Sequence, residues 1–176
     1  MITIPTMTNI TAWEFPEDAV AGQEAFLAHW AKPVETYVRA YAFTMKELAD
    51  VICEAAKTAP QHIYADRSQS ESEEQKACLK QCIECPGVDV TIGTSPAGKG
   101  FIAHTKAYIG VNGDFWEGST NFSHSAWHQV NTAFQGNCAP WATMMITAFH
   151  RDVQFAWEEE KEYQLADEPP SFFSAA

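Results

Sequence analysis

The amino-acid sequence predicts an α/β protein built on one mixed β-sheet flanked by helices. Strand and helix patterns alternate along most of the chain, which is typical of layered α/β folds. A length of 176 residues, with 46% hydrophobic and 19% charged residues, suits a single domain with an ordinary core. No internal repeat is visible. We expect that domain over residues 22–165, preceded by an N-terminal extension, 1–21, and followed by a flexible tail, 166–176.

The first half of the domain alternates helices and strands, each assigned from the spacing of its apolar residues. In chain order we expect a helix over 20–31, a strand over 35–44, a helix over 46–58, a strand over 61–66, a helix over 72–85 and a strand over 88–92. The Ser and Glu cluster at Ser68–Glu73 supplies the N-terminal cap of the third helix.

The second half begins with a predicted β-hairpin, which follows a loop rich in Gly, Pro and Ser. Residues 101–110 follow a period of two, and Asn112-Gly113 is a strong signal for a tight turn. Beyond the turn we expect a return strand over 114–119, a short helical turn near Ala126 capped by Ser123 or Ser125, a strand near 129–134 and a long helix over 140–163.

The predicted hairpin carries side chains suited to phosphate chemistry. The period of two places His104 and Lys106 on one face of their strand, and the return strand brings Ser119 and Asn121 toward the same end. A neutral imidazole can attack phosphorus, a lysine ammonium can hold a non-bridging oxygen, and hydroxyl and amide groups add neutral donors. The pattern therefore predicts phosphoryl transfer through a phosphohistidine, without a metal.

This pattern resembles the signature of the phospholipase D superfamily, which is His-x-Lys, four residues, Asp, six residues and Gly-Ser-x-Asn. From His104, the Gly-Ser-Thr-Asn of 118–121 lies in register without a gap. The resemblance also covers three strand segments, Ala40–Thr44, His62–Arg67 and Gly87–Val90. In length and order the chain is most similar to the small bacterial endonucleases of the superfamily that carry a single motif.

The resemblance implies a phospholipase D-like α-β-α sandwich and a metal-independent phosphodiester hydrolase, with a nucleic-acid endonuclease that cuts DNA rather than RNA as the favoured activity. It assigns His104, Lys106, Ser119 and Asn121 to the catalytic site and implies no metal or other cofactor. The family's chemistry uses two His-x-Lys units and this chain has one, so we expect a homodimer that shares one site. One His104 then attacks phosphorus, and the partner subunit's His104 protonates the leaving oxygen.

Two positions depart from the family pattern. Val111 occupies the place of the motif Asp, with Asp114 nearby. Many relatives also carry a carboxylate that orients the nucleophilic histidine, where this chain has the stretch 128–132. Within that stretch, Gln129 and Asn131 resemble a neutral variant of the supporting group, which would fix the imidazole tautomer but stabilise its charged form less than a carboxylate does. Weak activity, or none, is therefore one expectation.

The overall charge argues against a simple duplex-DNA nuclease. The chain has 11 Lys and Arg against 23 Asp and Glu, a formal net charge of -12, which opposes the approach of a polyanion. Either a local group of cations attracts phosphate against this general field, or the substrate is smaller than duplex DNA. The candidates for such a group are Lys46, Arg67, Lys99 and Lys106.

Neither a membrane span nor a secretion signal is evident. No apolar run approaches the ~20 residues that a spanning helix needs, and Met1–Pro16 lacks the pattern of a signal peptide. We therefore expect a cytoplasmic protein without a membrane anchor. An odd number of cysteines, five, agrees with reduced thiols in a reducing compartment. They are Cys53, Cys78, Cys82, Cys85 and Cys138.

The sequence leaves three functions open. The favoured one is a nucleic-acid endonuclease or phosphodiesterase of the phospholipase D type. The second keeps the same chemistry on a phospholipid headgroup or another small diester, which an acidic chain without a basic patch does little to support. The third is a catalytically impaired binding or assembly protein with the same fold, suggested by Val111 and the missing orienting carboxylate.

Overall fold

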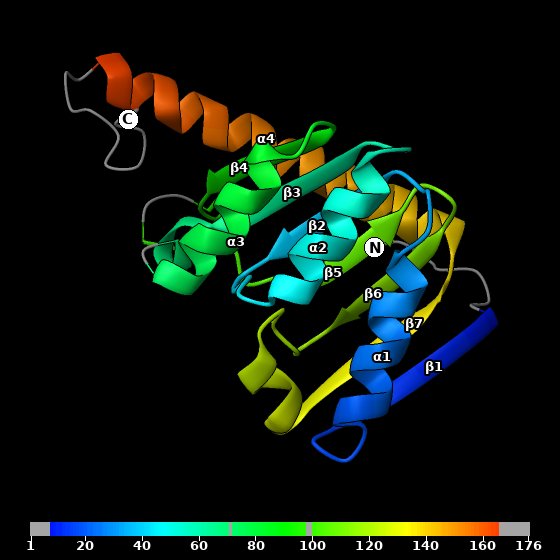
Figure 1. The fold of residues 1–176 in the computed structure, drawn as a ribbon. Coiled ribbons are helices and arrows are strands. Elements are labelled where there is room, and N and C mark those ends of the chain that lie inside the picture. Colours follow the sequence, from blue (N-terminus) through cyan, green and yellow to red (C-terminus); the bar gives the residue numbers. More distant parts are fainter. Residues whose placement is uncertain (1–7, 71, 98–99, 166–176) are drawn as a thin grey trace.

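The computed structural model describes residues 8–70, 72–97 and 100–165, which form one seven-stranded sheet between two helical layers (Figure 1). The strand order across the sheet is β1-β7-β6-β5-β2-β3-β4. The strands are β1 (Thr8–Phe15), β2 (Thr36–Ala40), β3 (Gln61–Asp66), β4 (Val88–Gly93), β5 (Ala107–Gly110), β6 (Asp114–Gly118) and β7 (Asn131–Asn137). The helices are α1 (Ala19–Trp30), α2 (Lys46–Ala56), α3 (Glu73–Glu84) and α4 (Ala139–Leu165), with short 3-10 turns η1 (Arg67–Gln69) and η2 (His124–His128).

The sheet is mixed, which confirms the predicted fold class. Strands β2, β3 and β4 run parallel, while β5, β6, β7 and β1 continue the sheet with antiparallel pairs. Helices α2 and α3 connect the parallel strands, as βαβ units require. The turn at Asn112-Gly113 joins β5 to β6, where Gly113 adopts a positive φ of 94°.

Each face of the sheet has its own hydrophobic core. Helices α1, α2 and α3 cover one face, and α4 crosses the other (Figure 1). Phe26 of α1 is fully buried among aromatic rings from β6, η2 and the segment after β6, including Trp116, Phe122 and Trp127. Such rings bury large apolar areas and favour tilted or edge-on contacts. This aromatic core fixes the hairpin and the η2 turn against α1.

Strand β1 is not among the predicted elements. It uses residues 8–15 of the predicted N-terminal extension and pairs with β7 at the sheet edge. Alternate residues Trp13 and Phe15 pack on the α1 side, while most other β1 side chains with a described exposure face solvent. A strand with one neighbour and one buried face produces only a weak pattern in the sequence. The predicted tail, 166–176, lies outside the described residues.

The prediction of five reduced thiols is wrong for two of them. Cys53 on α2 and Cys85, the residue after α3, form a disulfide. Cys78, Cys82 and Cys138 are free and buried. Because two cysteines form a disulfide, the cysteines no longer argue for a reducing compartment. The cytoplasmic location stays a prediction.

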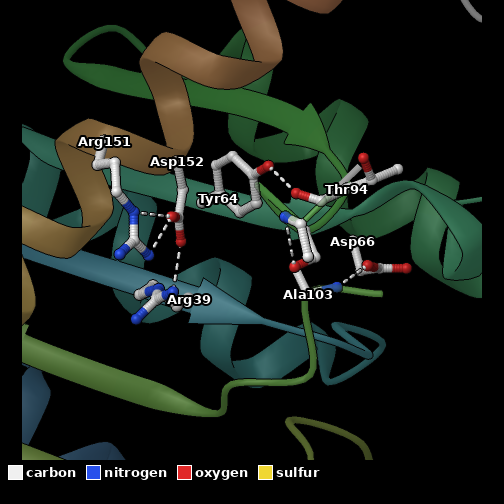
Figure 2. A network of polar contacts seen from close by, with 9 residues as sticks. Arg39, Tyr64, Asp66, Thr94, Ala103, Arg151 and Asp152 are labelled. Carbon is white, nitrogen blue, oxygen red and sulfur yellow. Dashed lines mark hydrogen bonds and ion pairs between the residues drawn. The ribbon is translucent and has the colours of Figure 1, made fainter. Parts of the chain in front are cut away.

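A buried ion pair ties α4 to the sheet. Asp152 of α4 is fully buried and accepts hydrogen bonds from Arg39 of β2 and from Arg151 (Figure 2). We predict that Asp152→Ala lowers the free energy of unfolding by about 3 kcal/mol, because the largely buried Arg39 then keeps a charge without its partner. Urea unfolding measures the loss. Asp50→Ala removes an exposed partner of Lys46 and serves as the control, with a midpoint close to wild type. Equal losses in both variants would contradict the prediction.

Candidate active site

The motif residues lie along the edge of the sheet that is formed by the ends of its central strands, and not along an outer strand. Arg39 at the end of β2 pairs with Ala107 at the start of β5, and Ala107 pairs with Glu117 at the end of β6. Strand β3 runs parallel to β2 and ends at the same edge. The carboxyl ends of β2, β3 and β6 therefore meet the segment that enters β5. This is the edge at which open α/β sheets bind ligands.

The segment before β5 is not a strand, so the prediction of a strand over 101–110 is wrong for residues 101–106. Asp66, the last residue of β3, is fully buried and accepts hydrogen bonds from the Ala103 backbone N–H and from both the backbone and hydroxyl of Ser68 (Figure 2). The Ala103 donor is thus taken by a side chain rather than by a neighbouring strand. Further back, the Thr94 carbonyl accepts from the Tyr64 hydroxyl at 2.6 Å. Asp66 fixes the chain directly before His104.

His104 is exposed, and its ring packs against that of Tyr41 at a tilt of 58°, with 4.6 Å between ring centroids. Within the described residues its imidazole has no hydrogen-bond partner. Partial burial and, second, the positive charge of Lys106 lower the pKa of His104, while the Asp66 carboxylate acts in the opposite direction. The lowered pKa favours the neutral imidazole, which is the nucleophilic form.

Lys106 is 3% exposed, which is unusual for a lysine. Its Nζ donates to the His104 carbonyl at 2.6 Å and lies 4.9 Å from the centroid of the Tyr41 ring. Burial lowers the pKa of Lys106 to about 8, although the Asp66 carboxylate pulls it upward. The ammonium therefore has no carboxylate in direct contact among the described residues and is available to an anion.

Gly118 joins the two halves of the motif. Its N–H donates to the Lys106 carbonyl at 3.3 Å, so the residues after β6 stay next to the His-x-Lys segment. A Cβ at position 118 would lie 2.1 Å from the Thr132 carbonyl oxygen, which leaves room for glycine alone. The Ser119 backbone N–H donates to the Thr132 carbonyl at 2.9 Å, and its Oγ accepts from the Thr132 N–H at 2.9 Å. Ser119 thus also binds β6 to β7.

Asn121 and Thr120 present buried polar atoms without partners. The Asn121 Oδ1 and Thr120 Oγ1 have no hydrogen-bond partner within the described residues. The next residue, Phe122, is fully buried, and its N–H donates to the Ala42 carbonyl at 3.2 Å, which places Asn121 beside the chain that follows Tyr41. An unpartnered buried polar atom is costly. The Asn121 amide is therefore uncommitted within the described residues, and its Nδ2 is the group that could donate to an anionic ligand at this edge.

The positions that depart from the family pattern have structural explanations. Val111 lies at the far end of β5, away from His104, and is 51% exposed. Asp114 supplies the carboxylate of this turn and accepts from Asn112 at 3.0 Å and Asn137 at 2.7 Å. This turn therefore has a hydrogen-bonded carboxylate on β6, although position 111 carries none.

Gln129 and Asn131, the predicted supporting residues, differ in their surroundings. The Asn131 amide donates to the Ala126 carbonyl at 2.8 Å and holds η2 against β7, whereas Gln129 is exposed. In the part of the chain that the structure describes, neither side chain forms a hydrogen bond with His104. Ser123 precedes η2 but its side chain does not cap the turn.

The cations predicted to gather around the motif are largely neutralised. Lys46 pairs with Asp50 at 2.9 Å, and Arg67 pairs with Glu159 at 3.8 Å. Lys99 lies outside the described residues. Among the cations of this group that the structure describes, Lys106 is therefore the one that no carboxylate contacts directly.

Neither a metal cluster nor a membrane helix is found in the described part of the chain. No group of three or more His, Cys, Asp or Glu residues is placed there to hold a metal ion. None of the described helices combines the length and the apolar character that crossing a bilayer requires.

Solved structures share this fold. NucT from Helicobacter pylori superposes with a TM-score of 0.72 at 13% sequence identity, covering 83% of this chain and 96% of NucT. Nuc from Salmonella typhimurium, a phospholipase D family member, gives a TM-score of 0.72 at 17% identity, covering 82% of this chain and 93% of Nuc. TrmBL2, an archaeal chromatin protein, gives 0.52 at 9% identity, covering 88% of this chain and 54% of TrmBL2. No protein-family model matches the chain, and no curated protein matches it in sequence.

The chain therefore has the phospholipase D fold, and the α-β-α sandwich predicted from the His104 and Gly118 motifs is confirmed. Among its structural neighbours, NucT and Nuc are covered almost end to end, so the predicted resemblance to small bacterial relatives is also confirmed for the fold.

Two residues of this site, Tyr41 and Asp66, escaped the sequence analysis. Both lie within segments that resemble family strands, and each stands where a buried strand of the sheet ends or has just ended. A polar residue at the carboxyl end of a buried parallel strand is the signal that could have found them.

The lowered pKa of Lys106 leads to a prediction independent of function. In protein labelled with 13C at the lysine Cε, we expect one signal to titrate with a midpoint at about 8 and to vanish in Lys106→Met. Burial disfavours the charged form, so the ammonium is present below this midpoint and lost above it. In Asp66→Asn the midpoint should fall further, because the carboxylate that raises the pKa is gone. A midpoint near the ordinary value of 10.5 would contradict the buried position of Nζ.

Proposed function

We propose that the protein is a metal-independent phosphodiester hydrolase that cuts nucleic acid, DNA rather than RNA, through a phosphohistidine. The observation that carries the proposal is a group of three side chains at one sheet edge. They are a His104 with a lowered pKa, a buried Lys106 ammonium and the unpartnered Asn121 amide. The shared fold of NucT and Nuc supports it.

In the proposed reaction, the imidazole of one His104 attacks phosphorus and forms a P–N bond while the P–O bond to the leaving group breaks. The partner subunit's His104 donates a proton to the departing oxygen. That second histidine then takes a proton from water, whose oxygen displaces the first imidazole from phosphorus and completes the hydrolysis. Two coupled imidazoles titrate as a pair, so one can be neutral while the other is protonated.

Lys106 and Asn121 hold the non-bridging oxygens of the phosphoryl group. A desolvated ammonium interacts with developing negative charge more strongly than a hydrated one does. Ser119 contributes a hydroxyl whose proton is held only by a long contact of 3.4 Å to the Thr132 carbonyl, so it can turn toward the phosphoryl group. By analogy with an oxyanion-hole donor, Lys106→Met should cost about 100-fold in rate.

The surface next to His104 supports a site shared by two protomers. Phe101 and Ile102 are 59% and 45% exposed and directly precede the Ala103–His104 segment. Apolar side chains of this size at a site edge suit a subunit contact. A two-fold axis near them would bring both copies of His104 together.

The first test is nicking of supercoiled plasmid in excess EDTA. We expect wild-type protein to cleave and His104→Ala to lose at least roughly 10³-fold in rate, as loss of a nucleophile does. His124→Ala is a matched control, because this exposed histidine pairs with Glu47 and takes no part in the reaction. Loss of wild-type cleavage on adding EDTA would overturn the metal-independent mechanism.

The second test addresses the shared site. When wild-type and His104→Ala chains are mixed and allowed to exchange, activity should fall with the square of the wild-type fraction, because only dimers with two intact histidines react. Sedimentation measured on the same samples reports the dimer. A linear dependence, or an active monomer, would contradict the shared site.

A binding or assembly protein with the same fold is the second candidate. It is favoured by the net charge of -12 and by a His104 imidazole without a carboxylate partner in the described chain. Part of TrmBL2, an archaeal chromatin protein that binds DNA, has a similar fold. Absence of cleavage of plasmid, bis-p-nitrophenyl phosphate and phosphatidylcholine would favour this candidate. Cleavage of the latter diesters without nicking would point to a small or lipid diester.

A further inference from the structure

Tyr41 contacts both ionisable groups of the motif. It follows the last residue of β2, and its partly buried ring lies 4.6 Å from the His104 ring, centroid to centroid. The Lys106 Nζ lies 4.9 Å from the centroid of the same ring. One aromatic side chain thus faces the nucleophile and the cation together.

His104 otherwise has little to fix its ring. Its imidazole has no hydrogen-bond partner within the described residues, and the side chain is exposed. An imidazole attacks in line only when its ring plane and nitrogen are correctly oriented, so a freely rotating ring reacts slowly. Asp66 fixes the backbone before His104 but not the ring.

Building on the proposed function, we infer that Tyr41 is a positioning residue, which orients the His104 imidazole through a tilted ring contact and holds the Lys106 ammonium over its ring. A cation over a desolvated aromatic face is attracted by the ring quadrupole. Tyr41 would thereby replace the orienting carboxylate that Gln129 and Asn131 do not supply. In this role Tyr41 acts through His104 and Lys106 and not by binding the substrate itself.

One hydrogen bond holds the Tyr41 hydroxyl, and two more hold the backbone directly after it. The Gln69 Nε2 donates to the Tyr41 hydroxyl at 2.9 Å, from the η1 turn that follows Asp66. The next carbonyl, that of Ala42, accepts from Phe122, and the Phe43 N–H donates to the buried Gln75 Oε1 at 2.8 Å. Tyr41 therefore links the end of β2, the turn after β3 and the segment after the second motif half.

Three variants separate the ring from the hydroxyl. Tyr41→Leu removes the ring, Tyr41→Phe keeps the ring and removes its hydrogen bond to Gln69, and Gln69→Leu removes that hydrogen bond from the other side. We expect kcat for bis-p-nitrophenyl phosphate or plasmid to fall roughly 10- to 100-fold in Tyr41→Leu, with KM little changed. Tyr41→Phe and Gln69→Leu should each lose much less, and by similar factors.

Two readouts distinguish positioning from a general loss of structure. In NMR spectra the His104 ring protons should show an upfield ring-current shift that Tyr41→Phe keeps and Tyr41→Leu loses. Without the ring the imidazole is more hydrated, so its pKa should rise toward the ordinary value, and the acid limb of the rate profile should move to higher pH. Lys106 and Asp66, the charged groups that act on His104, are unchanged in these variants.

The results also separate this inference from the proposed function. An unshifted His104 resonance in Tyr41→Leu, or full activity of that variant, would overturn the positioning role even if wild-type protein cleaves DNA. A loss in Tyr41→Phe equal to that in Tyr41→Leu, with Gln69→Leu unaffected, would overturn it in favour of direct contact between the phenol and substrate. If wild-type protein cleaves nothing, the proposed function fails, while the ring-current test still decides the contact.

Discussion

The Asp66 carboxylate ends β3 inside the protein, and most of the site depends on the hydrogen bonds that it accepts. A buried carboxylate requires several donors, and Asp66 obtains them from Ser68 and from the Ala103 backbone. Because Ala103 donates to this side chain, the chain before β5 leaves the sheet and exposes His104 at the edge. The same carboxylate acts on the pKa of both His104 and Lys106. One residue thus fixes the backbone of the motif and offsets part of the effect of burial on the pKa of its two ionisable groups.

The sequence predicted those parts of the fold that depend on local spacing. The predicted helix over 46–58 matches α2 closely, because apolar residues such as Leu48, Ile52 and Ala55 repeat with a clear helical period. The segment 101–106 shows an equally clear period of two and is not a strand, since its decisive hydrogen bond comes from Asp66, far away in the sequence. The motif itself was recognisable, but the roles of Tyr41 and Asp66 follow from neighbours across the sheet that no local pattern contains.

Although the protein is acidic overall, the Lys106 ammonium has no carboxylate in contact among the described residues and can bind an anionic ligand. Arg39 and Arg151 are committed to the buried Asp152, and Lys46 is paired at the surface with Asp50. Lys106 is the cation at the motif, and the groups that hold its ammonium are a carbonyl and an aromatic ring, both of them neutral. A phosphoryl oxygen would therefore meet a charge that no carboxylate in contact has already neutralised. The net charge of the chain, -12, says little about this one position.

The close approach between Gly118 and the Thr132 carbonyl shows that the motif contains residues of two kinds. Gly118 and Ser119 join β6 to β7 and are required by packing whether or not the protein reacts with anything. Within the described residues, the side chains of His104 and Asn121 form no hydrogen bond, and that of Lys106 donates only to the His104 carbonyl. In a descendant that lost its chemistry, selection on folding alone would preserve the Gly-Ser pair and let the other three drift. The glycine and serine that make the motif easy to recognise therefore indicate the fold. The identity of the remaining three residues indicates the activity.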